Sequence, residues 1–399
     1  MMDISQEQPF EVAVVQDASV ILDRDASVQK TIDLAERAAT TGARLVLFPE
    51  AFIPGYPRGL SFGAVVGSRT PAGRGLFRRY AENAIVVPGP ETERLAATAR
   101  DLEIYLAVGV IERDAVTRGT LYCTLLLWGP DGELLNKHRK LKPTASERLI
   151  WGEGDGSGLR AVPTALGNVG GLICWENYMP LARTALYTQG VELFLAPTAD
   201  ARDSWQATIR HIALEGRCFV LSCNQFVTKA DYPGDLDLAS QRELAAASDP
   251  MSRGGSAIVG PLGEYLAGPL WDEAGILHAT IDPGLLAEAR FDFDVVGHYS
   301  RPDLFFLAVN PLTAGGPHDA WDEVEMLDDM ILGTGLRGLL GAMPGLGGSF
   351  PDDDDDFPGP DDLDPFFPTF PAVWTEKPPS GPAKGPSRTP PKSPRRRKK

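Results

Sequence analysis

Short apolar segments typical of strands alternate with amphipathic segments typical of helices between residues 10 and 312, and this alternation restricts the possible folds most. The strand-like segments are FEVAVVQ (10–16), ARLVLFPE (43–50), YLAVGVIER (105–113), GNVGGLIC (167–174), VELFLAPTA (191–199) and CFVLSCNQF (218–226). Helices are predicted over 27–43, 91–104, 180–190 and 204–217. Hairpins are predicted over 121–141, turning at Asp131-Gly132, and over 254–269. Hairpins among the alternating elements predict a layered α/β domain whose sheets are not purely parallel.

The composition changes near residue 312. Residues 1–312 are therefore expected to form one domain, 313–345 a C-terminal extension, and 346–399 a disordered tail. The tail carries an acidic PDDDDD run and ends in the basic sequence RRRKK. The basic end resembles a nucleic-acid-binding or localisation patch, but the acidic run favours a solvated tail of mixed charge.

Charge and composition exclude several classes of function. The formal net charge of -16 argues against general affinity for nucleic acid or anionic membranes. Neither a signal peptide nor an apolar segment long enough to span a bilayer is visible. Four cysteines without a CxxC pair favour the cytoplasm over a disulfide framework. The five histidines do not fall at zinc-ligand spacings with these cysteines, so no metal is expected.

Cys174 lies where a strand-like segment meets a polar, aromatic turn. Trp175 and Glu176 follow it, and Pro180 is placed to begin the next helix. Backbone N–H groups of such a turn, with a nearby lysine, are expected to depress the thiol pKa and favour a nucleophilic thiolate. The alternative is a buried cysteine that acts as a small hydrophobe. Cys123, Cys218 and Cys223 lie in apolar strands without adjacent charge and are interpreted as core.

Two further residues have the chemistry to assist a cysteine nucleophile. Glu50 ends a buried strand, where burial would raise its pKa toward that of a general base; an ordinary glutamate at a loop entrance is the alternative. Lys140 ends the basic run 137–140, which is mostly expected to be solvated. Strand alternation nevertheless lets one basic side chain point inward. Glu147 and Arg148 follow closely enough to join a buried charge network.

Around these three residues the chain resembles the nitrilase superfamily, whose catalytic triad is Glu-Lys-Cys. The resemblance lies in LFPEAFIPGYPRG around Glu50, HRKLKPTASERLIWGEGDG around Lys140 and CWENYMPLARTALY around Cys174. Further similar segments extend it over roughly residues 8–312. Cys-Trp-Glu and LKPTxxER favour the true nitrilase branch. Cyanide hydratases and dihydratases are the nearest alternative, although they more often carry histidine at the position of Asn177. Amidases and carbamoylases of the superfamily are the other alternative.

The resemblance implies a four-layer α-β-β-α sandwich that hydrolyses an organic nitrile to a carboxylic acid and ammonia, with an amide as a minor product. Cys174 would be the nucleophile, Glu50 the general base, and Lys140 the group that stabilises the tetrahedral intermediate. Glu147 would position Lys140 or the substrate. No metal or organic cofactor is implied, and the substrates would be the nitrile and water.

The resemblance is less specific about the pocket and the assembly. Tyr56, Trp175 and Asn177 are expected to line or brace the substrate pocket, with local packing as an equal alternative. His298 is interpreted as structural because the triad already contains a base. Family subunits pair through helices and often extend into spiral filaments, so a homo-oligomer is expected. A non-catalytic scaffold that binds partners through its tail is a third hypothesis, which the intact triad argues against. The identity of the nitrile stays open.

Overall fold

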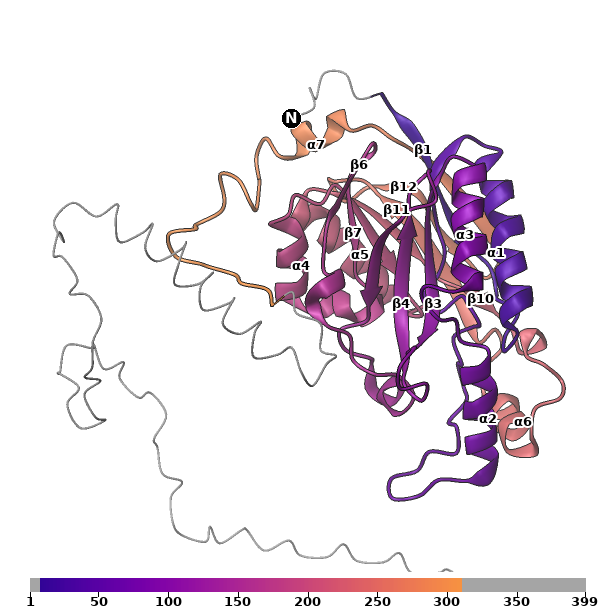
Figure 1. The fold of residues 1–399 in the computed structure, drawn as a ribbon. Helices are drawn as coiled ribbons and strands as arrows, with labels where there is room; N and C mark the ends of the chain where they lie inside the picture. The colour runs from indigo at the N-terminus through magenta and orange to yellow at the C-terminus, as the bar shows by residue number, and fades with distance from the viewer. Residues whose placement is uncertain (1–7, 311–399) are drawn as a thin grey trace, which may run out of the picture. The chain divides into compact units, whose positions relative to one another are not determined.

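A computed structural model of the chain describes residues 8–310. The domain boundaries expected at residues 312 and 345, and the charged tail, lie outside the described residues. Within them, strands and helices alternate much as the sequence predicts (Figure 1).

The first sheet has six strands and contributes Glu50 and Lys140 to the site. Its order is β13 (Gly275–Ile281), β1 (Phe10–Gln16), β2 (Ala43–Leu47), β3 (Tyr105–Arg113), β4 (Leu121–Trp128) and β5 (Leu134–Arg139). The pairs β1/β2 and β2/β3 are parallel, whereas β13/β1, β3/β4 and β4/β5 are antiparallel. The β4–β5 pair is the hairpin predicted to turn at Asp131-Gly132.

The second sheet contributes Cys174. Its order is β10 (Phe226–Val227), β11 (Ser252–Val259), β9 (Phe219–Cys223), β8 (Leu193–Pro197), β7 (Gly167–Gly171) and β6 (Val162–Thr164), and β12 (Tyr265–Trp271) pairs with β11. The pairs β7/β8 and β8/β9 are parallel, and the remaining pairs are antiparallel. Both sheets are therefore mixed, as the hairpins predict.

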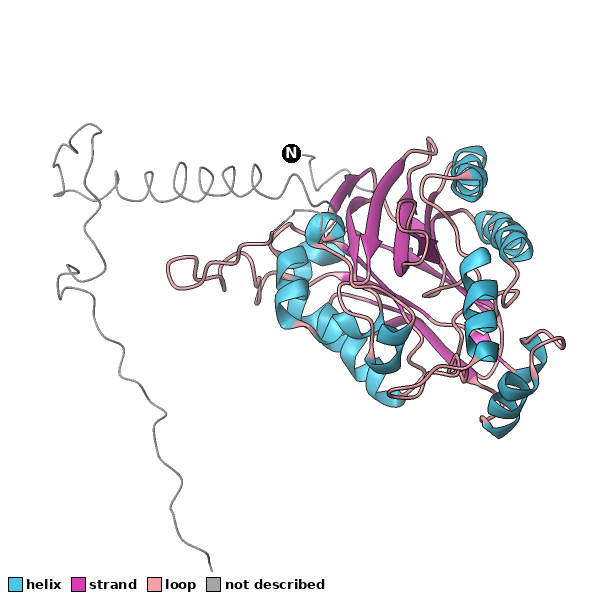
Figure 2. Cartoon of the chain, turned by 60° about the horizontal axis from the view of Figure 1, so that its bottom comes forward, coloured by secondary structure: helices cyan, strands magenta, loops and turns pink. Residues whose placement is uncertain are grey.

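Helices cover the outer face of each sheet (Figure 2). The helices α1 (Arg24–Ala39) and α3 (Pro90–Asp101) pack on the first sheet, and α4 (Pro180–Tyr187) and α5 (Asp203–Gly216) pack on the second. Three further helices, α2 (Pro71–Glu82), α6 (Leu238–Ala246) and α7 (Gly284–Ala289), complete the set in the described part of the chain. Pro180 occupies the first turn of α4, as expected, because its missing N–H costs nothing there.

Strand alternation divides the buried apolar side chains into three layers. In β1, Val12 and Val14 belong to the cluster between the two sheets, whereas Ala13 and Val15 belong to the cluster beneath α1 and α3. A third cluster lies between the second sheet and α4 and α5. Each sheet therefore buries both faces. The predicted four-layer α-β-β-α sandwich is confirmed.

Both strands that lead to the site end earlier than the sequence predicts. The strand expected over 43–50 ends at Leu47, and the one expected over 167–174 ends at Gly171. One more ladder hydrogen bond follows each strand, from Phe48 N to Ala107 O and from Leu172 N to Leu195 O. The backbone then leaves both sheets, which places Glu50 and Cys174 on the connecting segments.

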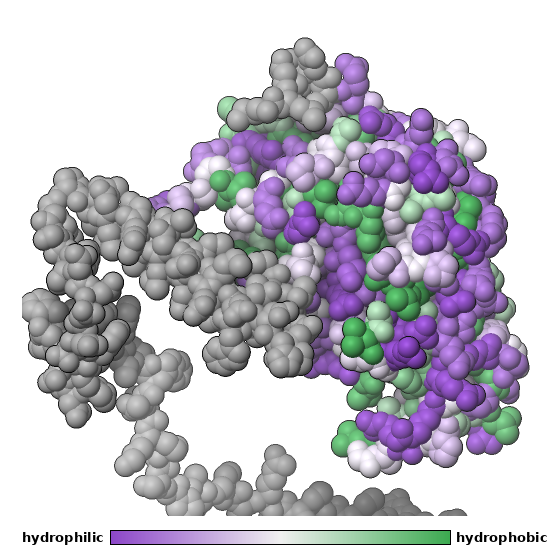
Figure 3. Space-filling view, in the orientation of Figure 1, coloured by the Kyte–Doolittle hydropathy of each residue, from purple (hydrophilic) through white to green (hydrophobic). Residues whose placement is uncertain are grey.

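The face of the molecule in Figure 3 is mostly hydrophilic, and its hydrophobic residues form small groups. Within residues 8–310, no helix is both long enough and apolar enough to cross a membrane.

Candidate active site

Cys174 lies on a tight turn with an unusual backbone conformation. Its φ is +51°, in the left-handed region that residues other than glycine seldom adopt, and a 3-10 turn follows over Cys174–Tyr178. The Asn177 amide donates hydrogen bonds to Leu172 O (2.9 Å) and Cys174 O (2.8 Å). These bonds hold both sides of the turn and so maintain a conformation that costs about 1–3 kcal/mol.

The thiol of Cys174 is buried and lies beside charged groups. Thr198 Oγ1 donates a hydrogen bond to Cys174 Sγ at 3.2 Å. Burial, reinforced by the negative charge of Glu50, raises the pKa of Cys174 to about 12, although Lys140 and Thr198 oppose this shift. The expected depression of the thiol pKa is therefore wrong, because desolvation of the thiolate outweighs the lysine and the polar backbone. A thiol that stays protonated needs a base to activate it.

Glu50 is a fully buried carboxylate on the segment after β2. Lys140 Nζ donates to its Oε1 at 2.6 Å, whereas its Oε2 has no hydrogen-bond partner among the described residues. Burial raises the pKa of Glu50, in opposition to the positive charge of Lys140. The sequence-based expectation of a raised pKa is confirmed.

Gly109 on β3 makes room for the Glu50 segment. A Cβ at this position would lie 2.8 Å from the Cα of Glu50 and would collide with the carbonyl oxygen of Pro49. The glycine is needed because of this close backbone approach.

Lys140 follows directly after β5 and has no solvent exposure. Besides Glu50, its Nζ contacts Glu147 Oε2 at 2.8 Å. Burial favours the neutral amine, but the attraction of Glu50 and the other acidic groups is larger and raises the pKa of Lys140 well above its usual value. Lys140 is therefore an ammonium held between two carboxylates.

Alternation along β5 separates the basic run into two pairs. Lys137 and Arg139 bind Glu112, whereas His138 and Lys140 are both buried on the opposite face. The sequence predicted one inward basic side chain, but there are two, since residues two apart on a strand share a face.

Glu147 connects three neighbouring groups. It accepts hydrogen bonds from Thr144 N (2.6 Å), Tyr56 Oη (2.6 Å) and Lys140 Nζ (2.8 Å). Glu147 therefore joins the buried charge network, as expected. Arg148 does not, because it is exposed and its Nε donates to the carbonyl oxygen of Pro143.

A cavity of about 610 Å³ opens onto this network and contains Cys174 and Glu147 in its wall. Of the three expected pocket residues, Tyr56 and Trp175 line the cavity, and Trp175 Nε1 donates to Asp200 Oδ2 at 2.8 Å. Asn177 does not line it but is buried beneath the Cys174 turn, so its place is that of a brace. His298 lies exposed and is not among the lining residues.

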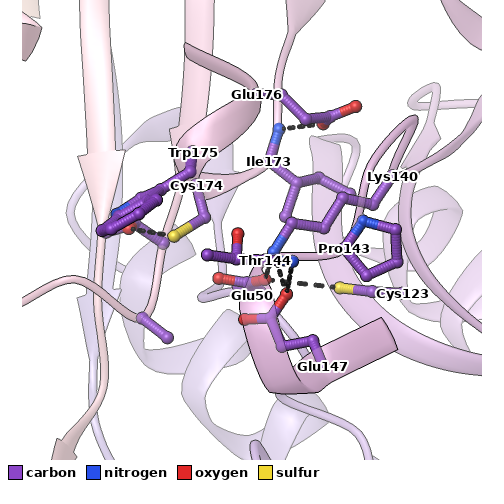
Figure 4. A network of polar contacts seen from close by, with 12 residues as sticks. Glu50, Cys123, Lys140, Pro143, Thr144, Glu147, Ile173, Cys174, Trp175 and Glu176 are labelled. Carbon is purple, nitrogen blue, oxygen red and sulfur yellow. Dashed lines mark hydrogen bonds and ion pairs between the residues drawn. The ribbon is translucent and has the colours of Figure 1, made fainter. Parts of the chain in front are cut away.

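Sequence reasoning missed the position of Cys123. It is buried, as expected, but its thiol donates to Glu50 Oε1 at 3.6 Å, and Figure 4 shows it beside Glu50 and Lys140. Burial and the charge of Glu50 raise the pKa of Cys123 well above its usual value. The pairing of the predicted hairpin could have revealed this position. Thr124 lies opposite Arg139, so the next pair in the antiparallel register is Cys123 and Lys140. The backbone N–H of Lys140 donates to Cys123 O at 2.7 Å.

Three segments far apart in the sequence therefore meet at one point. Figure 4 shows Glu50, Lys140 and Cys174 close to one another, with Glu147 below the contact between Glu50 and Lys140. Within residues 8–310, no group of three or more histidine, cysteine, aspartate or glutamate side chains is placed to hold a metal ion. The arrangement combines a thiol, a buried carboxylate with one oxygen that has no hydrogen-bond partner in the described part of the chain, and a fixed cation, which suits nucleophilic catalysis.

Comparison with known proteins identifies the family. The carbon-nitrogen hydrolase family matches residues 11–291. The chain belongs to the carbon-nitrogen hydrolase family. An aliphatic nitrilase of Sinorhizobium fredii (strain HH103) is 54% identical over 301 residues, which cover 75% of this chain and 96% of the relative. A bifunctional nitrilase/nitrile hydratase of Lupinus angustifolius is 50% identical over 307 residues, 75% of this chain and 87% of the relative.

The solved structures support the fold of this carbon-nitrogen hydrolase. Nit3 of Saccharomyces cerevisiae, a member of branch 10 of the nitrilase superfamily, has a TM-score of 0.59 at 22% identity, and the match covers 75% of this chain and 98% of that structure. The family match and the identities of 54% and 50% to proteins named as nitrilases confirm the predicted resemblance to the nitrilase superfamily.

Proposed function

We propose that this enzyme hydrolyses organic nitriles to carboxylic acids and ammonia, with Cys174 as the nucleophile. The observation that carries this proposal is that Oε2 of the buried Glu50 has no hydrogen-bond partner within residues 8–310 and is free to accept a proton. Glu50 belongs to the same charge network as Glu147, which lines the cavity together with the protonated thiol of Cys174. The high identity to proteins named as nitrilases, over most of their length, supports the same activity.

In the first half of the reaction, Glu50 accepts the thiol proton of Cys174 and the sulfur attacks the nitrile carbon. The proton passes from Glu50 to the nitrile nitrogen, which gives a thioimidate bound to the enzyme. A water molecule then adds to the thioimidate carbon while Glu50 takes its proton. The ammonium group of Lys140 stabilises the resulting tetrahedral intermediate from a fixed position.

The second half of the reaction depends on which bond of the intermediate breaks. Loss of the protonated nitrogen as ammonia leaves a thioester, and a second water releases the carboxylic acid and restores the thiol. Loss of the thiol instead releases an amide after the uptake of one water. The name of the lupin relative includes both a nitrilase and a nitrile hydratase activity, so both products are to be measured.

The cavity favours an organic nitrile over cyanide. Its volume of about 610 Å³ falls within the 300–1,000 Å³ range that is common for small-molecule sites. Cyanide would leave most of this volume unfilled and would contact few of the lining residues. A cavity of this size therefore binds a larger nitrile more selectively than cyanide. Cyanide hydratase or dihydratase activity is therefore the weaker alternative.

The test is ammonia release from matched nitrile and amide pairs and from cyanide, with separate quantification of acid and amide. We expect the wild type to hydrolyse nitriles. Each of three substitutions should abolish this activity: Cys174→Ala, Glu50→Gln and Lys140→Ala. Cys218→Ala serves as the control because Cys218 is also buried but packs between the second sheet and its helices. Full activity of Cys174→Ala would refute the mechanism, and a preference for amides would assign the enzyme to the amidases.

We further propose that the enzyme is a cytoplasmic homo-oligomer, with a dimer as the unit of a spiral filament. None of its four cysteines forms a disulfide in the described structure, which suits a reducing compartment. Size-exclusion chromatography of the full chain, and of a chain ending at Leu312, would test the oligomer and any effect of the tail on its size. A monomeric full chain would contradict the proposal.

A further inference from the structure

Glu176 is a completely buried carboxylate that the mechanism does not use. It does not line the cavity, and both its oxygens are occupied. Its Oε1 accepts the N–H of Leu141 at 2.5 Å, and its Oε2 accepts the N–H of Ile173 at 2.6 Å. His138 Nε2 lies 3.2 Å from Oε1 and 3.0 Å from Oε2. Because both oxygens accept hydrogen bonds and the side chain does not reach the cavity, Glu176 is not placed to act as a second base.

The donors to Glu176 lie within two residues of Lys140 or Cys174. Leu141 follows Lys140 in the chain, and His138 lies on β5 two residues before Lys140, with its side chain also buried. Ile173 precedes Cys174 on the segment that follows β7 of the second sheet. One carboxylate therefore joins the segment that carries the cation to the turn that carries the nucleophile. Figure 4 shows the bond between Glu176 and Ile173 next to Cys174.

We propose that Glu176, together with His138, is a positioning residue that fixes the separation of Lys140 and Cys174. The inference rests on the proposed function, in which both residues act on one reacting carbon. A displacement of about 1 Å in such a pair can cost about 100-fold in rate. The Glu176 side chain alone links the segment after β5, at Leu141, to the segment after β7, at Ile173, so this connection is short.

The charges around the pair support the bridge. His138 and Glu176 have side-chain exposures of 1% and 0%. Burial alone would lower the pKa of His138, but Glu176 and, more weakly, the backbone of Gly158 and the charge of Asp155 outweigh it, so that the pKa is raised. A charged imidazolium against a carboxylate forms a stronger hydrogen bond than a neutral pair.

The central variant is Glu176→Gln, which keeps the shape of the side chain. Its NH₂ group must face one of the two backbone N–H donors, so one side of the bridge opens. The matched control is Glu112→Gln. Glu112 is also a buried carboxylate that binds side chains of β5, Lys137 and Arg139, but it has no contact with the Cys174 turn.

Two measurements separate positioning from stability alone. The first is kcat and KM for a nitrile that the wild type hydrolyses. The second is the rate at which iodoacetamide alkylates Cys174 as a function of pH, followed by intact mass with Cys174→Ala as the blank. The alkylation assay needs no nitrile. If the proposed function fails but wild-type Cys174 is alkylated, the assay still reports the effect of Glu176 on the position of Cys174.

For Glu176→Gln we expect kcat and the alkylation rate each to fall by about tenfold or more, with KM within about threefold, since geometry and not binding is lost. Glu112→Gln should leave both rates within about threefold of the wild type, whatever its thermal stability. A folded Glu176→Gln variant with wild-type kcat and alkylation would overturn the proposal. So would equal losses in both variants.

If Glu176→Gln does not fold, two variants of His138 decide the question. His138→Gln retains an N–H that can reach Glu176, whereas His138→Leu does not. The proposal requires the alkylation rate to be higher in His138→Gln than in His138→Leu. Equal rates in the two variants would overturn it.

Discussion

Replacement of Lys140 by methionine is the most direct test of the buried charge network. The substitution keeps an unbranched side chain of similar length but removes the cation that lies 2.6 Å from Glu50 Oε1 and 2.8 Å from Glu147 Oε2. Removal of one partner from a buried ion pair typically costs about 3–5 kcal/mol, because the remaining charge stays desolvated. Since two carboxylates lose the same partner, we expect the upper part of this range at pH 7.

The loss should become smaller as the pH falls. Lys140 lowers the pKa of Glu50 in the native protein, so its removal raises the folded-state pKa of Glu50 further above the unfolded value. The folded variant then binds a proton at a higher pH than the unfolded chain does. Stability therefore rises as the pH falls through the folded pKa, with about 1.4 kcal/mol for each unit of pKa difference. We expect Lys140→Met to lie closer to the wild type at pH 5 than at pH 7.5.

The assay is urea-induced unfolding followed by tryptophan fluorescence and far-UV circular dichroism, with stability taken from the midpoint and the slope. Lys137→Met is the control on the same strand. Lys137 has a side-chain exposure of 35%, and its partner Glu112 keeps the hydrogen bonds of Arg139, so this substitution should cost about 0–1 kcal/mol. Equal destabilisation by the two substitutions, or a Lys140→Met deficit that grows toward low pH, would refute the reasoning.

Three further outcomes follow from the site. Glu147→Gln should move the acid limb of the kcat/KM profile to lower pH, because the charge of Glu147 raises the pKa of Glu50; a move to higher pH would contradict this. Gly109→Ala should push the Glu50 segment aside and cost about 1–3 kcal/mol with a loss of kcat, measured by thermal unfolding and initial rates; wild-type values of both would count against the close contact. His138→Leu should lower Tm most below pH 6.5, the ordinary pKa of histidine, and the Tm difference should shrink as the pH rises through the raised folded pKa; a pH-independent difference would argue against a charged His138.

The polar residues of the site differ in how far the sequence could place them. Lys140 and Glu147 are seven residues apart, so a shared network was predictable from proximity, and strand alternation allowed one basic side chain of the run 137–140 to point inward. The same alternation carries His138 inward, but its partner Glu176 is 38 residues away, in the turn that follows β7 of the second sheet. The periodicity of nearby residues contains no information on a pairing between residues so far apart. The link that Glu176 makes between the segments of Lys140 and Cys174 could therefore not be predicted from the sequence.

The pKa of the Cys174 thiol is a second property that local sequence could not predict. A turn with a nearby lysine predicts a depressed pKa when only local groups are considered. In the folded chain, burial and the negative charge of Glu50 dominate and raise the pKa of Cys174 to about 12. The sign of the shift depends on solvent exclusion by both sheets, which is a property of packing.

The sequence by itself determined the mixed α/β layering, because apolar periodicity and turn residues act over a few positions, and its motifs indicated Glu50, Lys140 and Cys174. Only the tertiary structure decided that Cys123 donates to Glu50, that Glu50 keeps one oxygen unpaired, and that Glu176 joins the two halves of the site. These features depend on how two sheets face each other across a buried layer, and the free energy of that packing is shared among residues far apart in the chain.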